Sequence, residues 1–277
     1  MSTRVAEATV TQERWKPTPL VAASMGLHGL AGMGLLLGAE AWPWAIGAVA
    51  ANHVFLGAVG MWPRSTWLGA NLTRLPDAAR ARHEIALTFD DGPDPDITPR
   101  VLDILDEHGV RATFFCIASE ATKHPELCRE IVRRGHAVEN HSREHAMDFA
   151  MRGMGGMRRE ISAAQSDLAT LTGRVPRFFR PPAGIRSPLL DPVLHDLGLK
   201  LASWTRRGFD TRLSDADFVH ARLAHQLAAG DILLLHDGHC ARAADGEPVV
   251  LHVLPRLIRQ AQSLGLKPVT LDHATTP

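Results

Sequence analysis

From residue 85 to near its end, the chain alternates short apolar runs with amphipathic stretches, several of which end at a glycine. Strand followed by helix, repeated in this way, predicts a parallel sheet with helices outside it. The sequence has no glycine fingerprint for a dinucleotide, which favours a closed or nearly closed barrel over an open doubly wound sheet. The seven predicted strands are residues 85–89, 111–117, 136–140, 177–181, 199–204, 231–236 and 267–271.

The N-terminal part of the chain has a different composition. Residues 20–39 and 41–61 are two uncharged apolar runs separated by Glu40, and each is about long enough to cross a bilayer. They predict a transmembrane helical hairpin. The predicted division of the chain is an N-terminal tail at 1–19, the hairpin at 20–61, a linker along the membrane surface at 62–82 and a folded domain at 83–277.

Two other interpretations of the apolar runs remain open. Polar residues within them, such as His28 and Asn52, fit a glycine-rich appendage packed on a soluble domain. Basic residues before the first run and "AEA" at 39–41 fit a secretory signal, although the second run argues against simple secretion. For a hairpin, basic residues lie on both flanks and not between the runs. The positive-inside rule then predicts that both ends, including the large domain, are cytoplasmic, as in a bacterial-type inner-membrane protein.

The first predicted strand ends in the acidic pair Asp90 and Asp91, followed by Gly92. Asp-Gly is common in hairpin turns, so a simple turn is the first interpretation. A helix follows instead of a second strand, because Thr98 stands at a capping position and Pro99 at the first helical position. The carboxylates are therefore predicted at the C-terminal end of a strand, where α/β folds carry their chemistry.

Histidines and an arginine follow other strands at the same predicted rim. His141 and His145 are four residues apart, one helical turn, so both imidazoles can face one metal ion. The chain has 15 histidines, so this spacing also arises by chance, and its position gives it weight. Arg180 and His236 follow two further strands. Taken singly, each could be an ordinary structural group. An acidic residue with two histidines leaves coordination positions open, as catalytic zinc requires.

The motifs TFDDG, HSREH, RPPAG and LLLHDG, in this order, resemble those of the polysaccharide deacetylases of carbohydrate esterase family 4, which share the chitooligosaccharide deacetylase homology domain. The resemblance covers about residues 83–272. It implies a distorted (β/α)7 barrel and makes residues 83–277 a polysaccharide deacetylase-like catalytic domain. The fold class predicted for the chain is therefore α/β, a distorted (β/α)7 barrel with an N-terminal apolar helical hairpin.

The resemblance implies a metal centre with proton-transfer groups around it. Asp91, His141 and His145 would bind a divalent metal, and zinc suits these ligands. Asp90 would be the general base that takes a proton from the attacking water. Arg180 would orient Asp90 and keep it ionised through its opposite charge.

The resemblance also implies the remaining parts of the site. His236 would be the general acid that protonates the leaving amine, and Asp210 would hold its tautomer and raise its pKa. The backbone N–H of Ala183 would face the developing oxyanion, and Leu234 would line the pocket for the acyl methyl group. The family often carries Tyr where Ala183 stands, but the implied role belongs to the backbone.

The segment "SWTRRGFDT" departs from the family pattern, which usually combines a Trp and an Asp with a further Trp. Trp204, Arg206 and Arg207 are candidate substrate-binding residues. The two arginines indicate an anionic substrate group such as a phosphate.

The predicted function is metal-dependent hydrolysis of an N-acyl group, most simply N-acetyl, from an amino sugar, with a lipid-linked or phosphorylated sugar favoured by the hairpin and the arginines. The alternatives are hydrolysis of another amide, a formamide or cyclic ureide, on the same site; a 2-His-1-carboxylate Fe(II) oxygenase; and an inactive binding module. A formal net charge of zero gives no support for a nucleic-acid partner.

Overall fold

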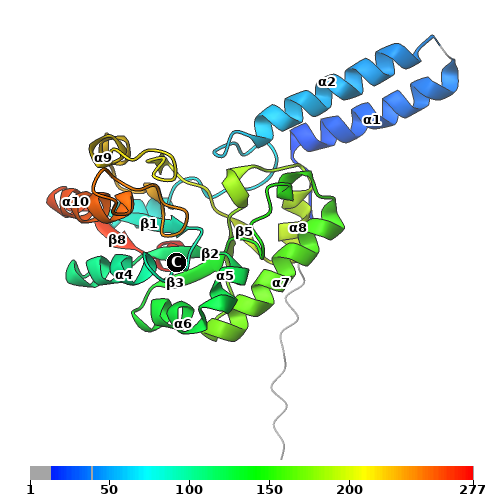
Figure 1. The fold of residues 1–277 in the computed structure, drawn as a ribbon. Helices are drawn as coiled ribbons and strands as arrows, with labels where there is room; N and C mark the ends of the chain where they lie inside the picture. Colours follow the sequence, from blue (N-terminus) through cyan, green and yellow to red (C-terminus); the bar gives the residue numbers. More distant parts are fainter. Residues whose placement is uncertain (1–13, 39, 277) are drawn as a thin grey trace, which may run out of the picture.

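The computed structural model describes residues 14–38 and 40–276. Most of the predicted N-terminal tail, residues 1–13, lies outside the described residues. The chain forms an apolar helical hairpin that projects from a larger α/β domain (Figure 1). The hairpin consists of α1 (Pro19–Leu37), which begins after the capping side chain of Thr18, and α2 (Trp42–Gly60).

The two helices of the hairpin are apolar and mostly exposed. Both are long and apolar enough to cross a membrane. Only 11% of the segment Pro19–Leu36 and 17% of the segment Trp42–Gly60 is buried. The polar side chains within them face each other: Asn52 donates to Ser24 at 2.8 Å, and the rings of His28 and His53 are in edge contact. Such pairing satisfies polar groups between helices that have no water around them. Their presence is therefore compatible with a hairpin in lipid.

The large domain is built on an eight-stranded sheet in the order β5-β4-β3-β2-β1-β7-β6, with β8 paired to β1. Every pairing is parallel. No pairing joins β5 to β6 within residues 40–276, so the barrel is open on that side. The strands are β1 (Glu84–Asp90), β2 (Thr113–Cys116), β3 (Ala137–Asn140), β4 (Phe178–Phe179), β5 (Lys200–Leu201), β6 (Arg206–Arg207), β7 (Ile232–His236) and β8 (Lys267–Val269).

Helices surround the sheet (Figure 1). β1 lies near the centre of the sheet and is buried along its whole length, as its continuous apolar run requires. The main core packs β1, β2 and β7 against α4, α6, α9 and α10. The helices are α3 (Asp77–Ala81), α4 (Thr98–Glu107), α5 (Ala118–Lys123), α6 (Pro125–Arg133), α7 (Met154–Thr172), α8 (Leu190–Asp196), α9 (Ala216–Ala224), α10 (Val249–Ser263) and α11 (Leu271–Thr275), with short 3₁₀ turns η1 (Phe149–Met151) and η2 (Pro182–Gly184).

This arrangement confirms the predicted parallel α/β barrel and its distortion, with two differences. The predicted strands at 177–181 and 199–204 each keep only two residues, as β4 and β5, and the following Arg206–Arg207 form the unpredicted strand β6. Residues 62–82 do not form a separate linker: Leu75 and Ala79 are buried in the core, and Leu72 forms a parallel bridge with Ala202. The apolar residues of this segment are interspersed with prolines and arginines. The sequence therefore shows no continuous apolar run that would have predicted their burial.

Candidate active site

The sheet brings its polar strand ends to one edge. Asp90 ends β1 and is the Cα partner of His236, which ends β7. β3 leads into His141, and β4 leads into Arg180. These four residues belong to separate segments of the sequence, and the parallel register places them together because parallel strands all end at the same edge.

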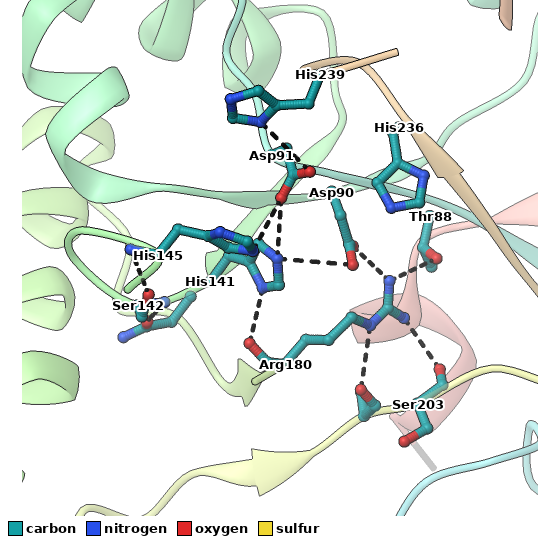
Figure 2. A network of polar contacts seen from close by, with 12 residues as sticks. Thr88, Asp90, Asp91, His141, Ser142, His145, Arg180, Ser203, His236 and His239 are labelled. Atoms are coloured by element: carbon teal, nitrogen blue, oxygen red, sulfur yellow. Dashed lines mark hydrogen bonds and ion pairs between the residues drawn. The ribbon is translucent and has the colours of Figure 1, made fainter. Parts of the chain in front are cut away.

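Arg180 is fully buried and holds Asp90 (Figure 2). Its guanidinium donates to Oδ1 of Asp90 at 2.6 Å and to Oγ1 of Thr88 at 2.9 Å. Two further bonds reach the carbonyls of Ala202 and Ser203 at 3.1 and 3.0 Å. Burial lowers the pKa of Arg180, and the charge of Asp90 opposes this. The pair fixes the Asp90 carboxylate in one orientation, with its other oxygen 3.8 Å from His141.

Asp91, His141 and His145 form a cluster beside this pair. One ligand atom from each residue lies within 4.8 Å of the others. Nε2 of His141 and Nε2 of His145 are each 3.3 Å from Oδ1 of Asp91. Figure 2 shows both imidazoles directed at the Asp91 carboxylate.

The donor atoms of this cluster fit a divalent cation. Oδ1 of Asp91 is buried and has no hydrogen-bond partner. Buried polar atoms are normally paired, so this oxygen has a lone pair available for a cation placed between it and the imidazoles. Nδ1 of His141 lies 2.7 Å from the carbonyl of Arg180, which fixes the proton on Nδ1 and leaves Nε2 free to bind a metal. One carboxylate and two imidazoles are a common ligand set for catalytic zinc.

The protonation states of two of the three candidate ligands, Asp91 and His145, fit this use; for His141, burial acts to lower the pKa, but the charges of Asp90 and Asp91 outweigh it and raise the pKa. Burial acts to raise the pKa of Asp91, but interactions with His141 and His239 outweigh it and hold the pKa well below its ordinary value. Burial, helped by the nearby His141, lowers the pKa of His145 to about 4. Asp91 is therefore ionised and His145 neutral at neutral pH, as metal ligands must be.

His141 and His145 do not occupy one turn of a helix, so the helical spacing assumed from the sequence is wrong. The segment is a loop in which Ser142 (φ 67°) and His145 (φ 50°) adopt left-handed backbone conformations. The Ser142 hydroxyl accepts from the backbone N–H of His145 at 3.0 Å, and Asn140 accepts from that of Ser142 at 2.9 Å. These bonds fold the loop back, so that both rings converge although no helix aligns them. Strained backbone of this kind is common at functional sites.

His236 faces the cluster and is held from behind by Asp210. Oδ1 of Asp210 is 2.8 Å from Nδ1 of His236, and Oδ2 accepts from its backbone N–H at 2.8 Å. Asp210 is fully buried. Burial acts to lower the pKa of His236, but the charge of Asp210 and its hydrogen bond outweigh this and raise the pKa. Such a His remains protonated at a higher pH, as a general acid requires.

These groups surround a cavity of about 390 Å³, a typical size for a small-ligand site. Arg180 and Asp210 lie behind its wall and orient Asp90 and His236. The cavity is lined by Asp90, Asp91, His141, His145, Met147, Ala183, Gly184, Trp204, Arg207, Thr211, Arg212, Leu234, His236 and His239. The predicted substrate-binding residues Ala183, Trp204, Arg207 and Leu234 are among them.

Arg206 does not line this cavity. Arg207, the next residue of β6, lines it. The guanidinium of Arg206 binds the buried carboxylate of Asp231 at 2.5 Å and the carbonyls of His225 and Gln226. The N–H donors of Arg206 are therefore engaged in hydrogen bonds within the protein.

The sequence prediction omitted five residues that line the cavity: Met147, Gly184, Thr211, Arg212 and His239. His239 lies 3.5 Å from Asp91 and is largely exposed, and Thr211 and Arg212 line the cavity. His239 stands three residues after His236 at the same strand end, which is a signal that could have indicated it. Thr211 and Arg212 directly follow Asp210, but nothing in their residue types distinguishes them from surface residues.

Comparisons with known proteins agree with this geometry. The family model described as polysaccharide deacetylase matches residues 77–202. A chitooligosaccharide deacetylase from Azorhizobium caulinodans is 36% identical over 56% of this chain and 73% of its own length. A peptidoglycan-N-acetylglucosamine deacetylase from Bacillus cereus is 31% identical over 68% of this chain, and the chain covers 66% of that relative, just under two thirds.

A solved structure gives the same result. The family 4 carbohydrate esterase from Streptomyces lividans, in complex with acetate, superposes with a TM-score of 0.61 at 31% identity, covering 67% of this chain and 91% of that one. Together with the shared motifs and the convergence of their side chains, these similarities show that the chain belongs to the polysaccharide deacetylase family.

Proposed function

We propose that this protein is a metal-dependent hydrolase that removes the N-acetyl group from an amino sugar. The observation that supports this best is the juxtaposition of two carboxylates with different partners. Asp90 is held by Arg180 and is free to accept a proton, whereas Asp91 faces two imidazoles and fits a cation. Across the cavity, His236 has a raised pKa and can supply a proton.

In this proposal, Asp91, His141 and His145 hold a divalent ion, with zinc the best match to two nitrogen ligands and one oxygen ligand. The ion, when bound, polarises the amide carbonyl and makes the attacking water more acidic. Asp90, held in place by its hydrogen bond with Arg180, takes the proton of that water. His236 then donates its proton to the leaving amine while Asp210 stabilises the imidazolium.

The cavity also supports the choice of the acyl group. Leu234 and Trp204 are apolar walls that suit a methyl group, and Ala183 lies in the left-handed conformation (φ 54°) on the exposed rim. The relatives named above include enzymes for chitooligosaccharide and peptidoglycan N-acetylglucosamine. An N-acetylated amino sugar therefore fits both the walls and the relatives.

We further propose that residues 20–61 anchor the chain in a bacterial-type inner membrane, with the catalytic domain in the cytoplasm and a lipid-linked or phosphorylated sugar as substrate. The support is the projecting apolar hairpin, whose large side chains such as Leu36 and Trp44 are exposed, and the arginines beside the cavity. Apolar surface of this extent is costly in water.

The test uses full-length protein in detergent, reconstituted with zinc and given chitooligosaccharides in parallel with formamide and cyclic ureide compounds. We expect acetate release together with a new free amine from the N-acetylated sugars. The control is Asp90→Asn, which we expect to bind metal like the wild type and to lose at least about 100-fold in rate. Turnover of the formamide or ureide alone, or full activity of Asp90→Asn, would refute the proposal.

A further inference from the structure

A second cavity of about 620 Å³ adjoins the catalytic one. The two share four lining residues, so a single extended ligand can occupy both: Ala183, Trp204, Arg207 and Arg212. The outer wall of the second cavity is the segment from Met61 to Arg64, which directly follows α2. The cavity therefore lies between the catalytic groups and the base of the apolar hairpin.

This second cavity is strongly basic. Its lining includes five arginines and no acidic residue. One of them, Arg206, is neutralised by Asp231. The other four make no ion pair with a carboxylate anywhere in residues 14–38 and 40–276; they are Arg64, Arg207, Arg212 and Arg222. We refer to these four residues as the arginine cluster.

Aromatic rings, in place of carboxylates, support the guanidinium groups of Arg207 and Arg222. The guanidinium carbon of Arg207 lies 5.4 Å from the ring centre of Trp204 and 4.8 Å from that of Phe209. The guanidinium carbon of Arg222 lies 4.7 Å from the same Phe209 ring centre. A cation on a ring face is held in place while its N–H edges stay available. Phe209 adopts a left-handed backbone (φ 63°), a strained conformation that the surrounding structure must maintain.

Arg207 shows most directly that a partner is missing. Its Nε is buried and has no hydrogen-bond partner, and burial lowers its pKa. A buried, unsatisfied donor on a cation is costly, so a folded protein keeps one mainly where a ligand supplies the acceptor. Guanidinium groups bind phosphate through paired N–H donors, because their planar fork matches the geometry of the phosphate oxygens.

We propose that the arginine cluster binds a phosphate group carried by the acylated amino sugar, while the sugar itself occupies the catalytic cavity. This inference rests on the proposed function, because it assigns the sugar to the deacetylase site. The wall formed by Met61 and Trp62 continues from the phosphate position to the apolar hairpin. A lipid chain attached through the phosphate would leave the cavity along that wall.

The experiment compares two probes that differ only in the phosphate: decyl N-acetylglucosaminyl phosphate diester and decyl N-acetylglucosaminide. N-acetylglucosamine 1-phosphate, which has the charge without the lipid, is the third arm. We expect the wild type to prefer the diester through a lower KM. Arg64→Gln and Arg222→Gln should each reduce this preference about tenfold, the loss expected for one charged hydrogen bond. The double variant should lose about 100-fold if the two contacts are independent.

Arg259→Gln is the matched control, since it removes the same charge from an exposed position on α10, a helix that contributes no residue to the second cavity. We expect it to keep the wild-type preference. Inorganic pyrophosphate, titrated by calorimetry, should bind the wild type and bind Arg64→Gln and Arg222→Gln more weakly. Circular dichroism melting of each variant separates a lost contact from a folding defect.

Equal kcat/KM for the diester and the glycoside would overturn the inference while leaving the deacetylase proposal intact. A variant that lowers kcat/KM equally for both substrates would show a structural role for the arginine and would also overturn the inference. Weaker binding of the variants to vesicles containing phosphatidylglycerol, with an unchanged substrate preference, would assign the cluster to a membrane phospholipid. If the wild type deacetylates neither probe nor chitooligosaccharides, the proposed function itself fails.

Discussion

Replacing Asp210 by Asn tests the proposed role of His236 as the general acid. Asn has the same shape and can still accept the backbone N–H of His236, which now bonds Oδ2 at 2.8 Å. It removes the negative charge that lies 2.8 Å from Nδ1 of the buried imidazole. A hydrogen bond to a charged group contributes about 1.5 to 3 kcal/mol. Burial then acts without opposition from Asp210, so the pKa of His236 falls.

The sign of the rate effect follows from the role. A general acid must be protonated, so activity declines as pH rises through its pKa, and a lower pKa moves that decline to lower pH. At slightly alkaline pH, we expect kcat of Asp210→Asn to fall about 10- to 100-fold. This is the factor in rate that corresponds to losing the charged hydrogen bond between Asp210 and His236. At acidic pH, the loss should be smaller.

The assay is acetate release from chitooligosaccharide across pH 5 to 9, with the metal content of each preparation measured in parallel. Wild-type protein and Asp210→Asn should contain the same amount of metal, because Asp210 does not contact the ligands. If the alkaline limb of the profile stays in place in a folded, metal-loaded Asp210→Asn, Asp210 does not control the acid and this reasoning is refuted.

Three further predictions concern the fold. Gly92→Ala should lower the free energy of unfolding by about 1 to 3 kcal/mol in urea titration, because an added Cβ would clash with the Asp237 carboxylate; unchanged stability would contradict the tight packing. Burial raises the pKa of Glu139 to about 8, so the folded state holds a proton that the unfolded state releases, and stability should fall as pH rises from about 4.5 to 8 by at most about 1.4 kcal/mol per unit. Glu139→Gln should flatten this slope in urea titrations at pH 5 and 8, and an unaltered slope would exclude Glu139 as its source. Residues 20–61 should keep the chain in the membrane fraction after alkaline carbonate washing, whereas release would show that the hairpin is not inserted.

The sequence was sufficient to predict the sheet edge that carries the candidate site, because several of the apolar runs stop at a polar residue. Asp90 and His236 were predicted at strand ends, and their register as neighbours in the sheet confirms that placement. The helical alignment of His141 and His145 was wrong because Ser142 and His145 adopt left-handed backbone conformations, which neither residue type requires. That conformation is imposed by hydrogen bonds within the loop and by packing, which residue types do not report.

The arginines show the same limit. Arg206 and Arg207 are equivalent in the sequence, but in the structure Arg206 is paired with Asp231 and only Arg207 lines the catalytic cavity. Arg64 and Arg222 are far apart along the chain and meet at one cavity because the segment after α2 packs into the domain. Tertiary contacts of this kind have no local signature.

The account depends most on one cation held by Asp91, His141 and His145. The direct measurement is metal content and deacetylase activity of the full-length protein before and after exhaustive chelation, and after zinc is restored, with Asp91→Ala beside the wild type. We predict about one divalent ion per wild-type chain, loss of activity on chelation, recovery with zinc, and no bound ion in folded Asp91→Ala. Full activity in chelated protein of verified zero metal content would contradict the proposed chemistry.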